Sequence, residues 1–426
     1  MNMAVSAVCI ACLRPPIDHC LPAPYALTHN MDESLELDDR SVSLKFGLNY
    51  FMLFAIYGIS SPYLQLMVHR LGYSPAAVGL FLGFFELIGI AGPIYLAQRA
   101  DRHGKLKPFL FASTAMILVG LVLLVLFRVP SVTLLSMALL SLGIKTPVPV
   151  LDTALLRAIE FAPKIGQKVP NYGLLRAIGS VGFVVVTLIA QGIPGFDSSS
   201  TGAMALAMGV VTCLFFASLF SLPEIGSPQP RKEKINVSFK WLDSTYLLGL
   251  GVIALGRFAM APISSFFSMY LIEELNWHAV GAMWALAAAC EIPFIILSWK
   301  FIQKKSPMLA VAIASGAVVV RLFIYALFPT PTGAVVGQIL HSLCYGLFQP
   351  AALAFVNLKT PPADRTTGIA LYMGLGMGLP TFLGSSLGGV IAETFGYRWL
   401  FASFTLFAVA SLALFWKFRA QLTAVR

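Results

Sequence analysis

Apolar residues occupy most of the chain in long runs, which are separated by short gaps rich in charge, proline and glycine. Each run contains about 20 residues, the length that a helix needs to cross the ~30 Å hydrocarbon core of a bilayer. A span in lipid must satisfy its own backbone hydrogen bonds, so we expect helices. The pattern predicts twelve spans, at about residues 46–68, 76–98, 108–127, 132–156, 172–193, 201–221, 245–271, 279–299, 308–328, 333–357, 367–391 and 397–416.

One long polar gap, residues 222–244, divides these spans into two sets of six. The pattern therefore predicts an all-α membrane protein with two six-helix bundles, at 46–221 and 245–416, joined by a cytoplasmic linker at 222–244. The second and eighth spans begin with similar sequences, in which Val78-Gly79 and Val280-Gly281 lie 202 residues apart. This similarity favours parallel repeats of the kind that transporters use. Residues 1–45 and 417–426 are predicted to be tails.

The N-terminal tail has two interpretations. Either it is disordered, or translation begins at Met31, which an acidic polar stretch follows. Cys9 and Cys12 form a lone CxxC, and a metal site would need a second pair of ligands. We expect no metal and no cofactor.

Lysine and arginine in the gaps predict the orientation. Gaps on one side of the predicted membrane carry 16 of these residues, whereas gaps on the other side carry only Arg70, Arg128 and Arg398. Basic residues gather in cytoplasmic loops, so both termini are predicted to be cytoplasmic. The prediction is a multi-pass protein of the cytoplasmic (inner) membrane.

Composition excludes several classes of protein. The chain is 58% hydrophobic and only 11% charged, against about 25% charged in soluble domains. Its net charge of +10 is spread over many gaps, which argues against nucleic-acid binding. No P-loop, clustered nucleophile and base, or H-x-x-x-H is found, so we expect neither a nucleotide-driven pump nor an enzyme. A membrane sensor without transport remains a less favoured alternative.

Charged and titratable residues inside the predicted spans are the candidate functional groups. A charge at the bilayer centre costs at least about 2.5 kcal/mol, so it needs a function or a partner. For any one of these residues, an alternative explanation is about as good: it pairs with another charge and only stabilises the helix bundle. These residues are Glu86, Lys145, Asp152, Arg176, Arg257, Glu291, Arg321 and His341.

Depth along the spans predicts partners for these residues. Asp152 and Arg176 lie at matched depths in the antiparallel fourth and fifth spans, and Arg321 and His341 match in the ninth and tenth. Glu291 lies slightly deeper, so we expect Glu291, Arg321 and His341 to form a proton relay. Lys145 is either a counter-charge for an anionic substrate or a partner of Glu86 or Asp152.

The segment AQRADRHGKLK, residues 97–107, resembles the loop signature G-x-x-x-D-[RK]-x-G-[RK]-[RK] of the major facilitator superfamily. It departs from the signature at Ala97 and Leu106. The resemblance assigns Asp101, Arg102 and Gly104 to a cytoplasmic gate loop.

Further segments resemble the branch that contains lactose permease and the phenylpropionate permeases. TPVPVLDTALLRA (146–158) and NYGLLRAIGSVGF (171–183) are similar to its fourth and fifth spans, and EIPFIIL, VVVRLFIY and GQILHSLCYGLFQP to its eighth to tenth. The resemblance gives Asp152, Arg176 and Phe183 substrate-binding roles. It also gives Glu291, Arg321 and His341 coupling roles, while Cys344 stands where lactose permease has its main protonated glutamate.

The resemblance implies a secondary transporter that works by alternating access. We expect proton-coupled symport of a small organic solute such as an aromatic carboxylate, with Lys145 facing the substrate. The alternative is a proton symporter or facilitator for a sugar or nucleoside. The expected partners are the solute, protons and the lipid bilayer, and the protein is expected to act as a monomer.

Overall fold

The computed structural model describes residues 39–103, 106–162, 169–223 and 241–424, and every regular element in these ranges is helical. This is the outcome expected for apolar runs that must satisfy their own backbone groups. Cys9, Cys12 and Met31 lie outside the described residues.

The helices occur in the following order along the chain. They are α2 (Asp39–His69), α3 (Pro75–His103), α4 (Lys107–Leu126), α5 (Pro130–Lys145), α6 (Pro147–Phe161), α7 (Tyr172–Gly192), η2 (Phe196–Ser198), α8 (Thr201–Leu219), α9 (Ser244–Met269), η3 (Tyr270–Glu274), α10 (Val280–Lys304), α11 (Pro307–Leu327), α12 (Pro331–Lys359), η4 (Pro362–Asp364), α13 (Arg365–Leu371), η5 (Tyr372–Gly378), α14 (Leu379–Phe395), α15 (Tyr397–Lys417) and α16 (Arg419–Thr423).

Ten helical segments in the described residues are long and apolar enough to cross a membrane. Two shorter apolar stretches, Pro75–Ile90 and Val280–Glu291, lie in α3 and α10, where the second and eighth spans were predicted. The all-helical architecture is therefore confirmed, while the count of twelve spans stays a prediction. Helix α2 begins at Asp39 and α16 lies within 417–426, so regular structure extends into both segments that were predicted as tails.

The sequence encodes the helix starts locally. Asn171, Ser200, Asp243 and Thr330 are N-caps whose side chains accept hydrogen bonds from backbone N–H groups three residues later. Proline occupies the first turn of α4, α5, α6, α11, α12 and α14, where its missing N–H costs nothing.

Two of the predicted spans are interrupted. The fourth consists of α5 and α6, which meet at Thr146 because Pro147 begins a new helix there. The eleventh contains the π-helical segment η5 between α13 and α14, with glycine at 374, 376 and 378. Hydropathy reports length and polarity only, so it could not reveal either break.

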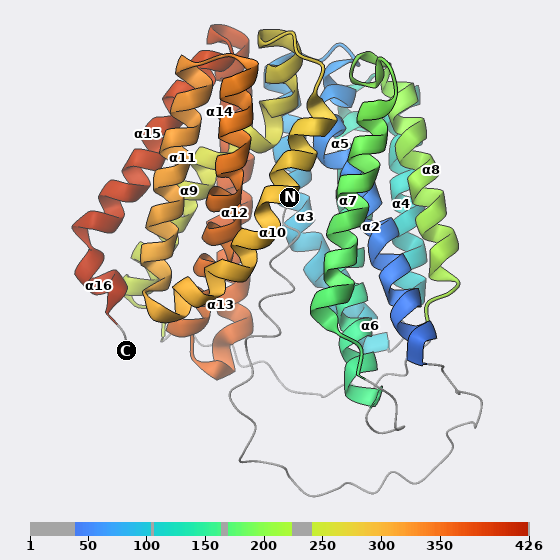
Figure 1. The fold of residues 1–426 in the computed structure, drawn as a ribbon, viewed down its shortest axis with the longest axis horizontal. Coiled ribbons are helices and arrows are strands. Elements are labelled where there is room, and N and C mark those ends of the chain that lie inside the picture. The colour runs from blue at the N-terminus through green and yellow to red at the C-terminus, as the bar shows by residue number, and fades with distance from the viewer. Residues whose placement is uncertain (1–38, 104–105, 163–168, 224–240, 425–426) are drawn as a thin grey trace, which may run out of the picture.

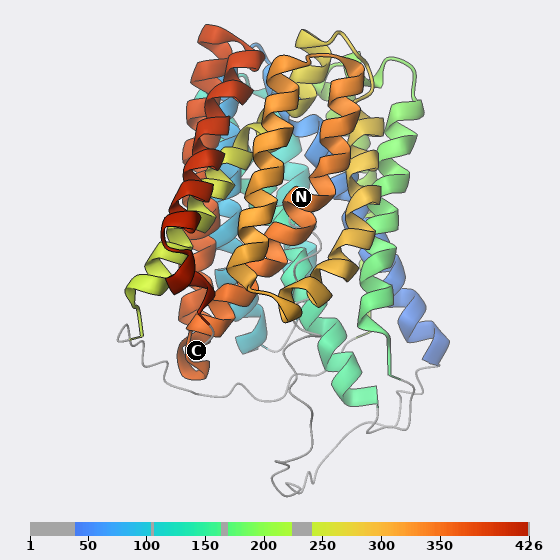
Figure 2. The same ribbon diagram turned by 60° about the vertical axis from the view of Figure 1, so that its left-hand side comes forward.

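The helices form two groups that correspond to the two halves of the sequence (Figures 1 and 2). Helix α2 packs on α7 and α8, and α4 on α5 and α8; in the second half α12 packs on α10 and α11, and α15 on α9 and α11. The halves meet along two helix pairs, α3 with α14 and α7 with α10. Between these two contacts, both halves border a central space.

The two ends of this helical assembly differ in charge. The basic end contains the helix ends at His103, Lys107, Lys304, Lys359 and Lys417. The opposite end carries the connections near residues 72, 128, 196, 277, 329 and 396. In Figure 1 the basic end is at the bottom, where α6, α13 and α16 lie.

Candidate functional site

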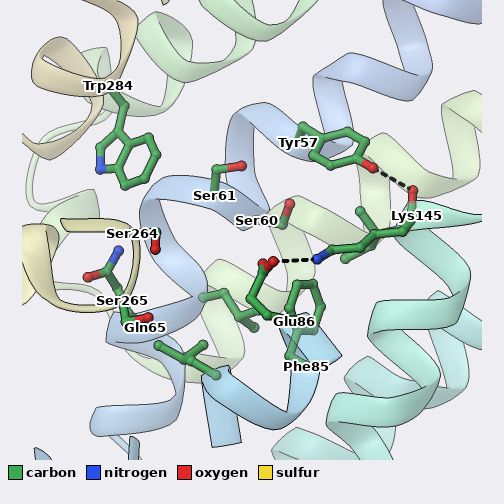
Figure 3. Close-up of a pocket in the computed structure, with 13 residues that line it drawn as sticks. Tyr57, Ser60, Ser61, Gln65, Phe85, Glu86, Lys145, Ser264, Ser265 and Trp284 are labelled. Atoms are coloured by element: carbon green, nitrogen blue, oxygen red, sulfur yellow. Dashed lines mark hydrogen bonds and ion pairs between the residues drawn. The ribbon is translucent and has the colours of Figure 1, made fainter. Parts of the chain in front are cut away.

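A central cavity lies between the halves and has two adjoining parts, which share Glu86, Ser264 and Trp284. The first chamber has a volume of about 60 Å³ and the second about 20 Å³. The first is lined by Tyr57, Ser60, Ser61, Leu64, Gln65, Leu82, Phe85, Glu86, Ile144, Lys145, Ser264, Ser265 and Trp284 (Figure 3). The second is lined by Glu86, Arg257, Ile263, Ser264, Phe267, Trp284, Ala287, Arg321, Gln338, His341 and Tyr345.

Lys145 and Glu86 form an ion pair in the wall of the first chamber (Figure 3). Lys145 Nζ lies 2.9 Å from Glu86 Oε2 and 4.8 Å from the centre of the Phe85 ring. The Tyr57 hydroxyl donates to the carbonyl oxygen of Ile144, beside Lys145, at 3.0 Å. Of the partners that the sequence left open for Lys145, the structure therefore has Glu86.

Asp152 and Arg176 also meet, as their matched depths predicted. Arg176 Nε lies 3.7 Å from Asp152 Oδ1, which accepts a hydrogen bond of 2.6 Å from Tyr50. The guanidinium group lies 4.3 Å from the centre of the Phe54 ring. Both charges are buried between α2, α6 and α7, and neither lines the two chambers. Their contact is confirmed, and their part in substrate binding stays a prediction.

Arg321 and His341 form a second predicted pair. Arg321 is fully buried, and its Nη1 lies 2.8 Å from His341 Nδ1. Its other nitrogens donate to Tyr325 Oη at 3.0 Å and to Gln338 Oε1. Because arginine has no acceptor, His341 Nδ1 must accept, which defines a neutral imidazole with its proton on Nε2. The His341 ring also stacks on Tyr345, with ring centres 4.4 Å apart.

Glu291 does not join this cluster. Its Cγ faces Gly346 of α12, and among the described residues it forms no ion pair or hydrogen bond. Ala287, one turn earlier in α10, lines the second chamber instead. Depth counting places a residue along a helix axis but not around it, so it could not separate these positions. A direct contact of Glu291 with Arg321 or His341 is absent from the described structure.

Arg257 is the main residue that the predicted site omitted. It is 4% exposed, and its Nε donates to Thr381 Oγ1 at 2.9 Å. Its guanidinium group lies 5.6 Å from the centre of the Tyr345 ring and, like that of Arg321, lines the second chamber. Within the described residues neither arginine has an acidic side chain at ion-pair distance. The chamber thus contains two guanidinium groups whose hydrogen-bond partners are neutral, and one carboxylate, that of Glu86, which forms its ion pair with Lys145.

Four predicted residues remain, of which Phe183 alone can be placed relative to the cavity. Phe183 of α7 is 1% exposed and belongs to the hydrophobic core, not to either chamber. Asp101 and Arg102 lie in the last turn of α3, and Gly104 lies outside the described residues. Their roles stay predictions.

Uncharged polar and aromatic residues complete the cavity, and no pattern in the sequence distinguishes them from other residues of the spans. Trp284 donates from Nε1 to Ser268 Oγ at 3.0 Å, and Gln65 Oε1 accepts from the Ser268 N–H at 3.1 Å. Such residues are also common where membrane helices merely pack, so composition alone does not distinguish them. Across the described ranges no group of three His, Cys, Asp or Glu side chains is placed to hold a metal ion.

The halves are in close contact at the opposite end. A Cβ on Gly281 would lie 2.6 Å from the carbonyl oxygen of Thr187, and one on Gly79 would be closer still to that of Ser385. Polar contacts reinforce this closure: His69 Nε2 lies 2.9 Å from Glu273 Oε1. The cavity is therefore closed towards this end.

Helical architecture, paired halves and a central charged cavity together define a membrane transporter. The model of the MFS_1 like family matches residues 43–403, so the chain belongs to this family of the major facilitator superfamily. It is an integral multi-pass membrane protein, in a family whose matched relatives are transporters and not enzymes.

Individual relatives are similar over most of their length. The maltose permease of Geobacillus stearothermophilus is 23% identical over 372 residues, which cover 85% of this chain and 90% of the permease. The probable 3-phenylpropionic acid transporter of Escherichia coli is 24% identical over 320 residues, covering 74% and 82%. The crystal structure of the nucleoside transporter NupG superimposes with a TM-score of 0.72 at 16% identity, covering 90% of this chain and 99% of NupG.

Proposed function

We propose that this protein is a proton-coupled symporter of a small organic anion, such as an aromatic carboxylate. In this proposal twelve spans form two six-helix bundles that alternate access to the central cavity. The basic end faces the cytoplasm, both termini lie there, and one chain in the inner membrane is sufficient for transport.

The observation that carries the proposal is the pair of buried guanidinium groups in the second chamber. Arg257 and Arg321 have only neutral hydrogen-bond partners, whereas Lys145 is already neutralised by Glu86. Buried charges in proteins are normally paired, because an isolated charge in a low-dielectric interior is expensive. A substrate anion would supply the missing negative charge, and a carboxylate matches the planar guanidinium group.

The surrounding side chains suit an aromatic body attached to that carboxylate, which the second chamber admits once it widens beyond its volume of about 20 Å³ in this conformation. Phe267, Trp284 and Tyr345 line the second chamber around the two arginines. Aromatic rings attract one another in offset or edge-to-face arrangements, and they exclude water from the charged contact. The similarity to a probable 3-phenylpropionic acid transporter agrees with this chemistry.

Binding of matched ligands to purified protein tests the proposal. We expect a panel of aromatic carboxylates to raise the thermal unfolding midpoint, whereas the corresponding primary amides do not. Arg257→Gln should weaken carboxylate binding about ten- to hundredfold, the equivalent of a hydrogen bond to a charged group. Arg128→Gln, at an exposed position of the opposite end, is the control. Equal binding of carboxylate and amide to the wild type would refute anion recognition.

Proton coupling is assigned to Glu291, with Arg321 and His341 responding to the same substrate. Glu291 lies in α10 without a basic partner among the described residues, so protonation removes the cost of its buried charge. Glu291→Gln imitates the protonated form and cannot release a proton. We expect it to abolish accumulation driven by a pH gradient in proteoliposomes while substrate exchange persists. Normal accumulation by the variant would show that Glu291 is structural.

A neutral polyhydroxylated solute, a sugar or nucleoside, is the second candidate. The first chamber favours it, because Ser60, Ser61 and Gln65 offer hydrogen-bonding groups opposite Ser264 and Ser265. The maltose permease and NupG similarities point the same way. This candidate is selected if a neutral sugar or nucleoside raises the thermal unfolding midpoint of the wild type and of Arg257→Gln equally. No carboxylate should then raise the midpoint of either protein.

A further inference from the structure

A groove of about 460 Å³ lies at the opposite end of the second half, apart from the central cavity. It is formed where α11 and α14 end, where α15 begins and where η3 ends. Its volume falls within the roughly 300–1,000 Å³ of typical small-molecule sites. Glu274, Leu327, Phe395, Arg398 and Trp399 are among its lining residues.

The position of the groove corresponds to a membrane interface. Leu327 and Phe395 are the last residues of two apolar helices, and Trp399 lies in the first turn of a third. Phe395 is 68% exposed and Trp399 66% exposed. Aromatic side chains at the ends of membrane helices typically lie at the level of the lipid head groups. The natural neighbour of the groove is therefore a phospholipid.

The groove contains one negative and one positive side chain that do not neutralise each other. Neither Glu274 nor Arg398 takes part in an ion pair within the described part of the chain. Arg398 Nε donates to the Ala326 carbonyl oxygen at 3.1 Å, which orients the guanidinium group. The wall beside them is held by Tyr397, whose hydroxyl donates to Glu273 Oε2 at 2.7 Å. The site is preformed and carries both signs of charge.

We propose that this groove binds the head group of a zwitterionic phospholipid with a primary ammonium group. Arg398 contacts the phosphate, Glu274 accepts hydrogen bonds from the ammonium group, and Phe395 and Trp399 contact the start of the acyl chains. An anionic head group would leave Glu274 facing like charge, and a trimethylated ammonium could not donate to it. The chemistry thus selects phosphatidylethanolamine over phosphatidylglycerol and phosphatidylcholine.

Native mass spectrometry of the full-length protein tests this site. The purified protein is mixed with equimolar phosphatidylethanolamine, phosphatidylcholine and phosphatidylglycerol, and the lipids retained after dilution are identified. We expect retention of phosphatidylethanolamine about tenfold above either competitor. In Glu274→Gln, the ratio of retained phosphatidylethanolamine to retained phosphatidylcholine should fall to about one. Arg398→Gln should lower retention of all three lipids, and Arg398→Lys should restore part of it.

Two further variants keep the test decisive. Ala402→Phe fills the groove without changing its charges, and it should release the lipid even if Glu274→Gln folds poorly. Arg128→Gln removes an exposed arginine at the same end of the first half and should change nothing. Preferential retention of phosphatidylglycerol, or identical lipid retention by the wild type and Ala402→Phe, would overturn the proposal.

Discussion

At the scale of single residues, the buried charges separate into those that are neutralised within the protein and those that are not. Two ion pairs are neutralised within the protein, Asp152 with Arg176 and Glu86 with Lys145. No ligand is needed to explain why such paired charges are present. Arg257 and Arg321 rely on neutral partners. This difference, more than the number of charges in the spans, directs attention to the second chamber.

The ion pair between Lys145 and Glu86 gives a direct prediction. Lys145→Gln leaves an uncompensated buried carboxylate, which should cost roughly 3 kcal/mol of stability. Glu86→Gln added to this variant should restore the thermal unfolding midpoint in detergent towards the wild-type value. A stable single variant that has lost carboxylate binding would instead mean that Lys145 holds the substrate.

The sequence predicted these pairs better than it predicted the site. Counting residues from the span ends matched Asp152 with Arg176 and Arg321 with His341, because helices have a fixed rise per residue. The same counting also grouped Glu291 with Arg321, although its side chain points to Gly346. Arg257 was recognised as an intramembrane charge, but no neighbour at matched depth drew attention to it. Which side chains share a cavity depends on helix rotation, which depth does not determine.

At the scale of helices, the boundaries follow local signals, and so does the break at Pro147 in the fourth span, whereas the π-helical segment of the eleventh span follows none. N-caps and first-turn prolines mark the helix starts in the sequence. The fourth span divides at Thr146, just before Pro147, and the eleventh contains the π-helical segment Tyr372–Gly378. Hydropathy averaged over a span contains no information about such interruptions.

The contact between α7 and α10 predicts how the opposite end opens. Gly281→Leu cannot fit against the Thr187 carbonyl oxygen, so it should favour separation of the two helices there. A steric penalty of ~1–3 kcal/mol shifts the population ratio about 5- to 150-fold. The rate at which a membrane-impermeant maleimide labels Ser264→Cys from that side, in a background without the native cysteines, measures the shift.

Gly316→Leu is the matched control, since a Cβ at this position of α11 meets no other atom within 4 Å. It should leave the labelling rate unchanged. Equal labelling of Ser264→Cys with and without Gly281→Leu would mean that this contact does not close the cavity.

At the scale of the whole molecule, the two halves provide a mechanism for moving a solute. They meet along α3 with α14 and along α7 with α10, and the cavity lies between them. Relative rotation of the halves can expose such a cavity to either side in turn. The sequence pointed to this arrangement through the polar gap at 222–244 and the similar Val-Gly segments, which the structure places at the contacts with α14 and α7.

Counterflow in proteoliposomes tests the central claim, that the protein transports an organic anion through this cavity. Vesicles loaded with an unlabelled aromatic carboxylate are diluted into a trace of the same labelled compound. The account predicts a transient overshoot of label that is abolished by Arg257→Gln and preserved in Arg128→Gln. An overshoot with a sugar or nucleoside but with no carboxylate of the panel would contradict it.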